Sequence, residues 1–138
     1  MPKWLRTREQ PASTLNNPVS YPVGSFIKTE KGFYYILSNT RRMRIITTRV
    51  LDSWSPARIV NTSEAAVQNY RVSSKLKFRN GSLIHNLADG KIYLIVEGKR
   101  CHITSPDVFP RIGAKGTKDV VSVSLAEINL HEEGETLN

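Results

Sequence analysis

Gly32-Phe33-Tyr34-Tyr35-Ile36-Leu37 returns in the second half of the chain as Gly90-Lys91-Ile92-Tyr93-Leu94-Ile95. The segments around these two strings match as well. The spacing between matching residues grows only from 57 to 61 along the repeat, as small insertions in turns would produce. The other matching pairs are Gly24-Ser25-Phe26-Ile27 with Gly81-Ser82-Leu83-Ile84, Arg42-Met43-Arg44-Ile45 with Arg100-Cys101-His102-Ile103, and Ile59-Val60 with Val120-Val121, ahead of Ser63 and Ser124. The chain is therefore an internal duplication in which each copy serves as a control for the other.

Each copy alternates β-branched and aromatic segments with turn residues, which predicts short strands. Both copies should then contain a short helix, started in the second by Ser105-Pro106-Asp107, and a second short helix capped by Ser63 or Ser124. The sequence thus predicts an α+β, mainly β fold, in which two tandem repeats of short antiparallel strands with short capping helices are related by a pseudo-two-fold. The expected strands are 33–37, 41–47 and 58–61 in the first copy and 82–85, 91–96, 99–104 and 119–123 in the second, with the first helix at 48–54.

The length of 138 residues suits one small domain or two very small ones. A copy of under about 60 residues buries little surface and is marginal alone. We therefore expect one compact domain built from both repeats, with repeat 1 at 23–76 and repeat 2, including an acidic tail, at 77–138. Residues 1–22 are expected to form an extended N-terminal arm, because four prolines interrupt any helix there.

The arm contains apolar and basic residues that a solvated tail does not need, namely Trp4, Leu5, Arg6, Leu15 and Tyr21. Two interpretations remain open. The arm can dock on another subunit, which makes these five residues candidates for partner binding, or Trp4 can fold back onto its own domain. The chain ends also carry opposite charges, which favour either head-to-tail contacts between copies or simple solvation.

The residues with catalytic potential do not form a site. Cys101 and His102 are neighbours on a predicted strand, so their side chains point to opposite faces. The first copy has Met43 and Arg44 there, which makes Cys101 a small core residue. The spacing of the three histidines fits no metal site, and the glycines form no phosphate loop. We therefore expect no catalytic residue, no cofactor and no metal.

A net charge of +8 and an isoelectric point near 9.9 raise the possibility of a nucleic-acid partner. Arg41, Arg42 and Arg44 lie close to Tyr34 and Tyr35 and can form a basic surface on which bases stack. The second copy mirrors this charge only in part. The same three arginines can equally bind an acidic patch on a protein partner.

The second copy also resembles a short repeat of bacterial cell-surface proteins and phage virion proteins. The resemblance is carried by Asp89-Gly90-Lys91-Ile92-Tyr93-Leu94-Ile95, then Gly98-Lys99-Arg100, His102-Ile103 and Ser105-Pro106, and by the closing string Asp119-Val120-Val121-Ser122-Val123-Ser124-Leu125. It covers residues 81–137 well and 24–76 more loosely, since Thr40 replaces the turn glycine. The motif describes a fold and transfers no catalytic residue.

The resemblance implies an interaction module displayed on a large assembly. The N-terminus does not have the features of a secretory signal, which favours a virion subunit assembled in the host cytoplasm over an exported wall protein. We therefore expect a structural or accessory subunit of a phage head, neck or tail, binding other virion proteins and copies of itself, with no membrane partner. A nucleic-acid-binding module and a cell-surface adhesion repeat are the alternatives.

Overall fold

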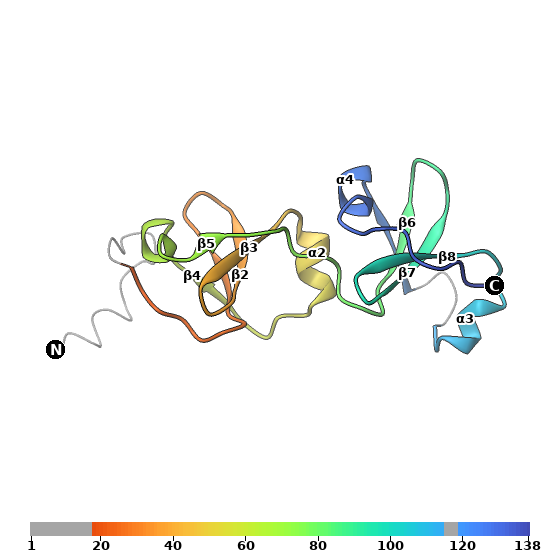
Figure 1. Cartoon of the computed structure of the whole chain (residues 1–138), viewed down its shortest axis with the longest axis horizontal. Coiled ribbons are helices and arrows are strands. Elements are labelled where there is room, and N and C mark those ends of the chain that lie inside the picture. The colour runs from red at the N-terminus through yellow and green to blue at the C-terminus, as the bar shows by residue number, and fades with distance from the viewer. Residues whose placement is uncertain (1–17, 115–118) are drawn as a thin grey trace. The chain divides into compact units, whose positions relative to one another are not determined.

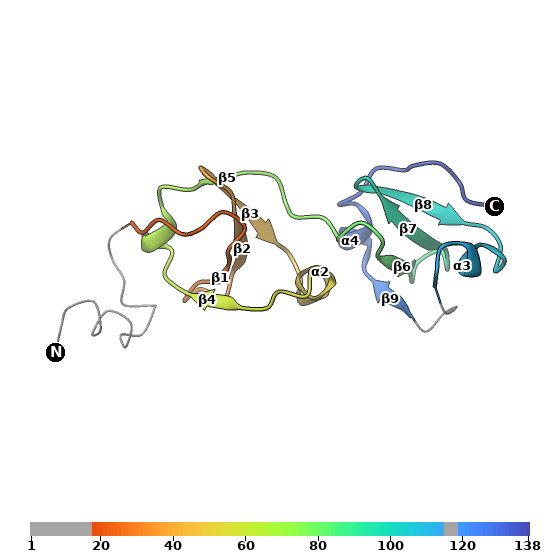
Figure 2. The ribbon, with the colours of Figure 1, turned by 90° about the horizontal axis from the view of Figure 1, so that it is seen from below.

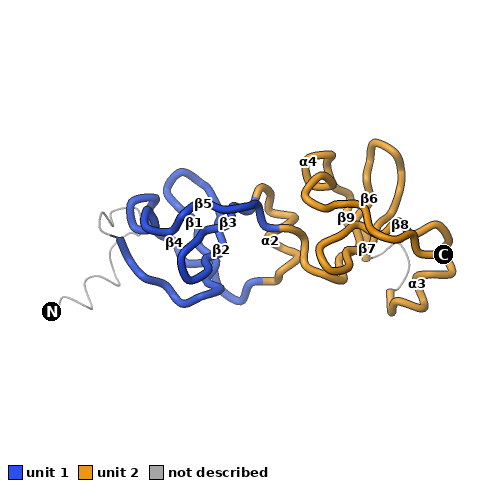
Figure 3. The backbone as a smooth tube through the Cα atoms, viewed as in Figure 1, with its two compact units in different colours: residues 1–45, 56–76 blue, residues 46–55, 77–138 orange. Residues whose placement is uncertain are grey.

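A computed structural model describes residues 18–114 and 119–138. The chain divides into two compact units, shown in different colours in Figure 3. Unit 1 consists of residues 1–45 and 56–76, and unit 2 of residues 46–55 and 77–138. Residues 46–55 therefore pack with unit 2, although in sequence they lie inside the first repeat.

Unit 1 is built on a five-stranded mixed sheet with the order β4-β1-β2-β3-β5 (Figures 1 and 2). The three central strands form an antiparallel meander, and the two outer strands join it in parallel. The strands are β1 (Phe26–Lys28), β2 (Tyr34–Leu37), β3 (Arg41–Ile45), β4 (Ile59–Asn61) and β5 (Arg71–Val72). A 3-10 helix at Ala65–Val67 precedes β5.

Unit 2 repeats this arrangement with a four-stranded sheet in the order β8-β7-β6-β9. Its meander is again antiparallel, and β9 joins β6 in parallel. The strands are β6 (Leu83–Asn86), β7 (Ile92–Val96), β8 (Lys99–Ile103) and β9 (Val120–Val123). The helices are α2 (Thr48–Ser53), α3 (Val108–Arg111) and α4 (Leu125–Ile128). The predicted α+β, mainly β fold is confirmed.

Strand register shows that the two units are copies of one another. Ile27 has Tyr35 and Val60 as its partners across the ladders, and Ile84 has Tyr93 and Val121. These are the pairings that the offsets in the sequence require. Both isoleucines are fully buried, because each lies on a central strand whose inner face is covered.

The helix caps follow the sequence closely, with one exception. Ser124 and Glu127 form a complete capping box on α4, and Ser63 accepts a hydrogen bond of 3.0 Å from the backbone of Ala66. Ser105 was expected to cap α3 directly. Instead α3 begins at Val108, and Ser105 closes the preceding turn by accepting the backbone N–H of Asp107 at 3.3 Å.

The C-terminal segment is a strand-like edge and not only a tail. Gly134 and Leu137 donate backbone hydrogen bonds to β8, at the carbonyls of Arg100 (2.9 Å) and His102 (2.8 Å). In unit 1, Ser73 and Leu76 make the equivalent bonds to the carbonyls of Arg42 (3.0 Å) and Arg44 (2.9 Å) on β3. Residues 132–137 are therefore the counterpart of residues 71–76, a match that is hidden in the sequence because the two segments share little beyond a leucine.

Candidate interaction surfaces

Four of the residues predicted to bind a partner, Trp4, Leu5, Arg6 and Leu15, lie outside the described part of the chain. The other four are Tyr21, Arg41, Arg42 and Arg44, which all belong to unit 1. The structure gives these four different roles.

Tyr21 lies within unit 1 and not on an extended arm. Its backbone N–H donates to the hydroxyl of Tyr70 at 2.9 Å, and its own hydroxyl shares a hydrogen bond of 2.6 Å with Thr62. In unit 2 the equivalent N–H, that of Phe78, donates to Nε2 of His131 at 3.2 Å. Because both units keep this contact, Tyr21 is part of the repeated architecture.

Arg42 is also an architectural residue. Its guanidinium lies 5.0 Å from the ring centre of Tyr35 and forms an ion pair of 3.2 Å with Glu64. Its counterpart Arg100 lies 5.9 Å from the ring centre of Tyr93 and donates to the backbone carbonyls of Ile128 and His131. With its side chain only 14% exposed, Arg42 is not available to a partner. Buried Tyr35 is likewise a core residue.

Arg44 remains accessible on the same face of β3. Its guanidinium stacks 4.0 Å from the ring centre of Phe33, which in turn packs edge-on against Tyr35 at 6.5 Å. A cation held over a ring is fixed in direction while its charge stays exposed to solvent. In unit 2 the equivalent residue is His102, so this exposed charge is specific to unit 1.

Arg41 faces another arginine. Arg41 on β3 and Arg71 on β5 are direct partners in the parallel ladder, and both side chains are exposed. Like charges directly opposite each other destabilise a sheet. No carboxylate of the described residues forms an ion pair with either of them. This edge of unit 1 therefore has unbalanced positive charge, which the sequence indicated only for β3.

The carboxylate of Glu127 in unit 2 is fully buried. Arg49 on α2 approaches it to 2.6 Å, and Thr47 donates to it at 2.7 Å. Burial acts to raise the pKa of Glu127, but the hydrogen bonds from Arg49, Ser124 and Thr47 outweigh it and lower the pKa to about 2. In the sequence, Glu127 is marked only by the capping-box pattern Ser124-x-x-Glu127. The structure shows that the same glutamate also binds α2.

His131 is held as a neutral ring inside unit 2. Its Nδ1 donates to the carbonyl of Gly98 at 2.8 Å, and its Nε2 accepts the N–H of Phe78. Burial lowers its pKa, and the charges of Lys77 and Arg100 add to this effect, against the opposing hydrogen bond to Gly98. Cys101 is buried, as expected of a core residue.

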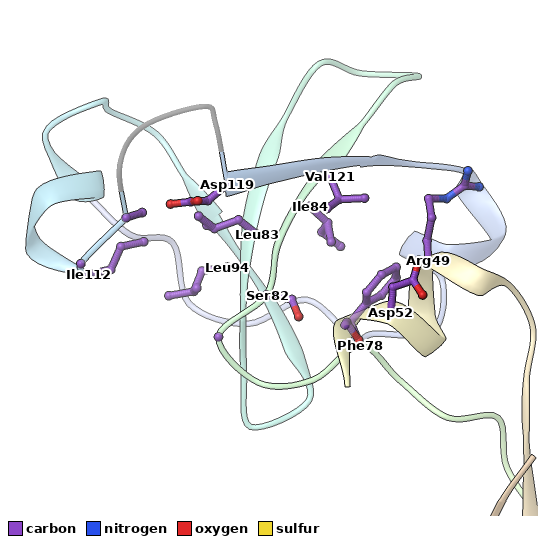
Figure 4. A pocket seen from close by; sticks show the side chains of 14 residues that line it. Arg49, Asp52, Phe78, Ser82, Leu83, Ile84, Leu94, Ile112, Asp119 and Val121 are labelled. Atoms are coloured by element: carbon purple, nitrogen blue, oxygen red, sulfur yellow. The ribbon is translucent and has the colours of Figure 1, made fainter. Parts of the chain in front are cut away.

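Unit 2 also has an open cavity of about 410 Å³ (Figure 4). Its walls are mostly apolar and include Leu83, Ile84, Leu94 and Phe78. Figure 4 shows the carboxylates of Asp52 and Asp119 at opposite ends of the cavity, so they do not converge on one point. The apolar part of this lining can accept an apolar group.

Comparisons with protein-family models, curated proteins and solved structures found no match to this chain. Among residues 18–114 and 119–138, no three or more His, Cys, Asp or Glu side chains are grouped to hold a metal ion. No helix in that same part of the chain is both long and apolar enough to cross a bilayer.

Proposed function

We propose that the protein is a non-enzymatic structural subunit of a bacteriophage particle, which binds neighbouring subunits through the exposed surfaces of its two units. One observation carries this proposal. The buried polar contacts that the two units share, such as those of Tyr21 and Phe78 or of Arg42 and Arg100, all serve to hold the fold. The units differ in the charges on their surfaces, which are the features that select a partner. The phage setting itself rests on the sequence resemblance.

Density-gradient fractionation tests this function. The full chain, produced in cells that assemble the particle encoded beside its gene, should sediment with the particles in a fixed number of copies and resist a wash in moderate salt. The protein remaining at the top of the gradient, with complete particles below it, would contradict the proposal.

Nucleic acid is the second candidate, and Arg41 facing Arg71 is the observation that favours it. Phosphates would neutralise both charges and release counterions, which makes binding salt-dependent. The test is a gel shift with R41E/R71E beside R42Q. A shift that R41E/R71E abolishes and R42Q retains would support this candidate, because Arg42 is bound to Glu64 within the fold.

A further inference from the structure

The outer segments of the two units occupy the same position but carry opposite charges. Residues 71–76 of unit 1 and 132–137 of unit 2 make equivalent hydrogen bonds to β3 and β8. Across this alignment Glu132 stands where unit 1 has Arg71, and Thr136 stands where it has Lys75. We call Arg41, Arg71 and Lys75 the basic edge, and Glu132, Glu133 and Glu135 the acidic edge.

Within the described part of the chain, the basic edge has no internal counter-charge. All three of its side chains are exposed. The nearby acid Glu64 is already bound to Arg42 at 3.2 Å, and no other ion pair in the described residues involves the basic edge. Since Arg41 and Arg71 are direct partners in the ladder, their repulsion lowers the stability of this edge until an anionic group approaches.

The acidic edge is exposed in the same way. The three glutamates point to solvent, and none forms an ion pair with a cation of the described residues. Lys99 on β8 is the unit 2 counterpart of Arg41, and its positive charge offsets one of the three negative charges of the acidic edge. A net negative charge therefore remains along the edge of unit 2.

We propose that the basic edge of one copy binds the acidic edge of a second copy of this chain. The contact rests on the proposed function and specifies how copies of the subunit meet each other. β5 is the last strand of its sheet, so one side of it is open to a neighbour. Two basic edges repel each other, as do two acidic edges, and only the unlike pair attracts. The charges thus direct the contact from unit 1 of one copy to unit 2 of the next.

Charge-reversal variants test this contact in the full chain by sedimentation at about 0.05 M and about 1 M salt, because screening is weak at the first and strong at the second. R41E/R71E/K75E reverses the basic edge, and E132K/E133K/E135K reverses the acidic edge. The matched control K31E/R58E/K91E makes the same change in net charge as the first variant, at exposed residues outside both edges.

The wild type and the control should associate with rising concentration at low salt and dissociate at high salt. Each reversal variant alone should stay monomeric, and an equimolar mixture of the two should associate again, because the mixture restores unlike edges. The recovery also shows that both variants are folded.

A wild type that is monomeric at low salt, a mixture that stays monomeric, or a control that dissociates like R41E/R71E/K75E would overturn the proposal. So would a wild type that binds a DNA duplex through the basic edge and remains monomeric without DNA. A chain that sediments with particles yet fails these tests overturns the edge contact alone, whereas absence from particles overturns the proposed function.

Discussion

At the scale of single residues, the ion pair between Arg49 and Glu127 links α2 to the α4 cap. Removing Arg49 leaves a buried carboxylate with only hydroxyl and backbone donors. An uncompensated buried charge is strongly destabilising. We expect Arg49→Ala to lower the free energy of unfolding by about 2–3 kcal/mol, measured by urea denaturation. Arg58→Ala, at an exposed arginine that forms no ion pair with the described residues, is the control, and equal losses in both variants would contradict this role.

The pH dependence of stability follows from His131 and Glu127. His131 has a folded pKa below its ordinary 6.5, so its contribution is complete above that pH and declines as the pH falls below it. Glu127 has a folded pKa of about 2 against 4.5, so its contribution is complete above 4.5 and is lost between 4.5 and 2.

Urea denaturation from pH 8 to pH 3 should therefore show a loss of stability beginning near pH 6.5 and a second below about pH 4.5. His131→Gln should flatten the first decline, because the variant has no imidazole to protonate at this position. A wild-type profile that is flat between pH 7 and pH 5 would contradict the neutral, buried ring.

At the scale of elements, Gly134 sets how closely the C-terminal segment packs on β8. A Cβ atom at this position would lie 2.8 Å from Sγ of Cys101 and 3.0 Å from Cβ of Lys99. Gly134→Ala should therefore lift the segment and uncover the thiol. Overpacking of this kind costs about 1–3 kcal/mol, so the rate at which Ellman's reagent modifies Cys101 should rise about tenfold. Thr136→Ala, at an exposed neighbour, is the control and should leave the rate unchanged.

At the scale of the whole molecule, the connectivity ties the two units together. The chain enters unit 2 at residue 46, returns to unit 1 at residue 56 and enters unit 2 again at residue 77. Val50 and Leu51 on α2 are buried, and a chain ending at residue 76 would have no unit 2 with which to bury them. We expect residues 1–76 alone to give no cooperative thermal transition by circular dichroism, and the full chain to give one. A cooperative transition in the fragment would show that repeat 1 folds independently.

The fold class and most strand positions could be predicted from the sequence, because they depend on local patterns. Turn glycines, alternating apolar residues and two aligned copies are enough to place Tyr35 and Tyr93 on equivalent central strands. The edge segments were harder to predict. Their hydrogen bonds use the backbone and place few demands on side chains, so Arg71 and Glu132 show no visible relationship in the sequence.

The candidate surfaces were predictable only in part. A run of arginines suggests one basic surface, but Glu64 lies against Arg42 alone and forms an ion pair with it, while Arg41 and Arg44 remain exposed. The role of Arg71 opposite Arg41 was not visible, because strand pairing brings together residues that are distant in sequence.

By itself the sequence determined that this protein is a duplicated β unit, because period-two patterns, turns and caps are local properties that each copy confirms in the other. Only the tertiary structure decided how the last segment of the second copy pairs with β8, which charges are neutralised and which remain exposed. Those outcomes depend on pairing and burial between distant residues. No local pattern encodes the approach of Glu64 to Arg42, or the pairing that sets Arg71 beside Arg41 and not beside an acid.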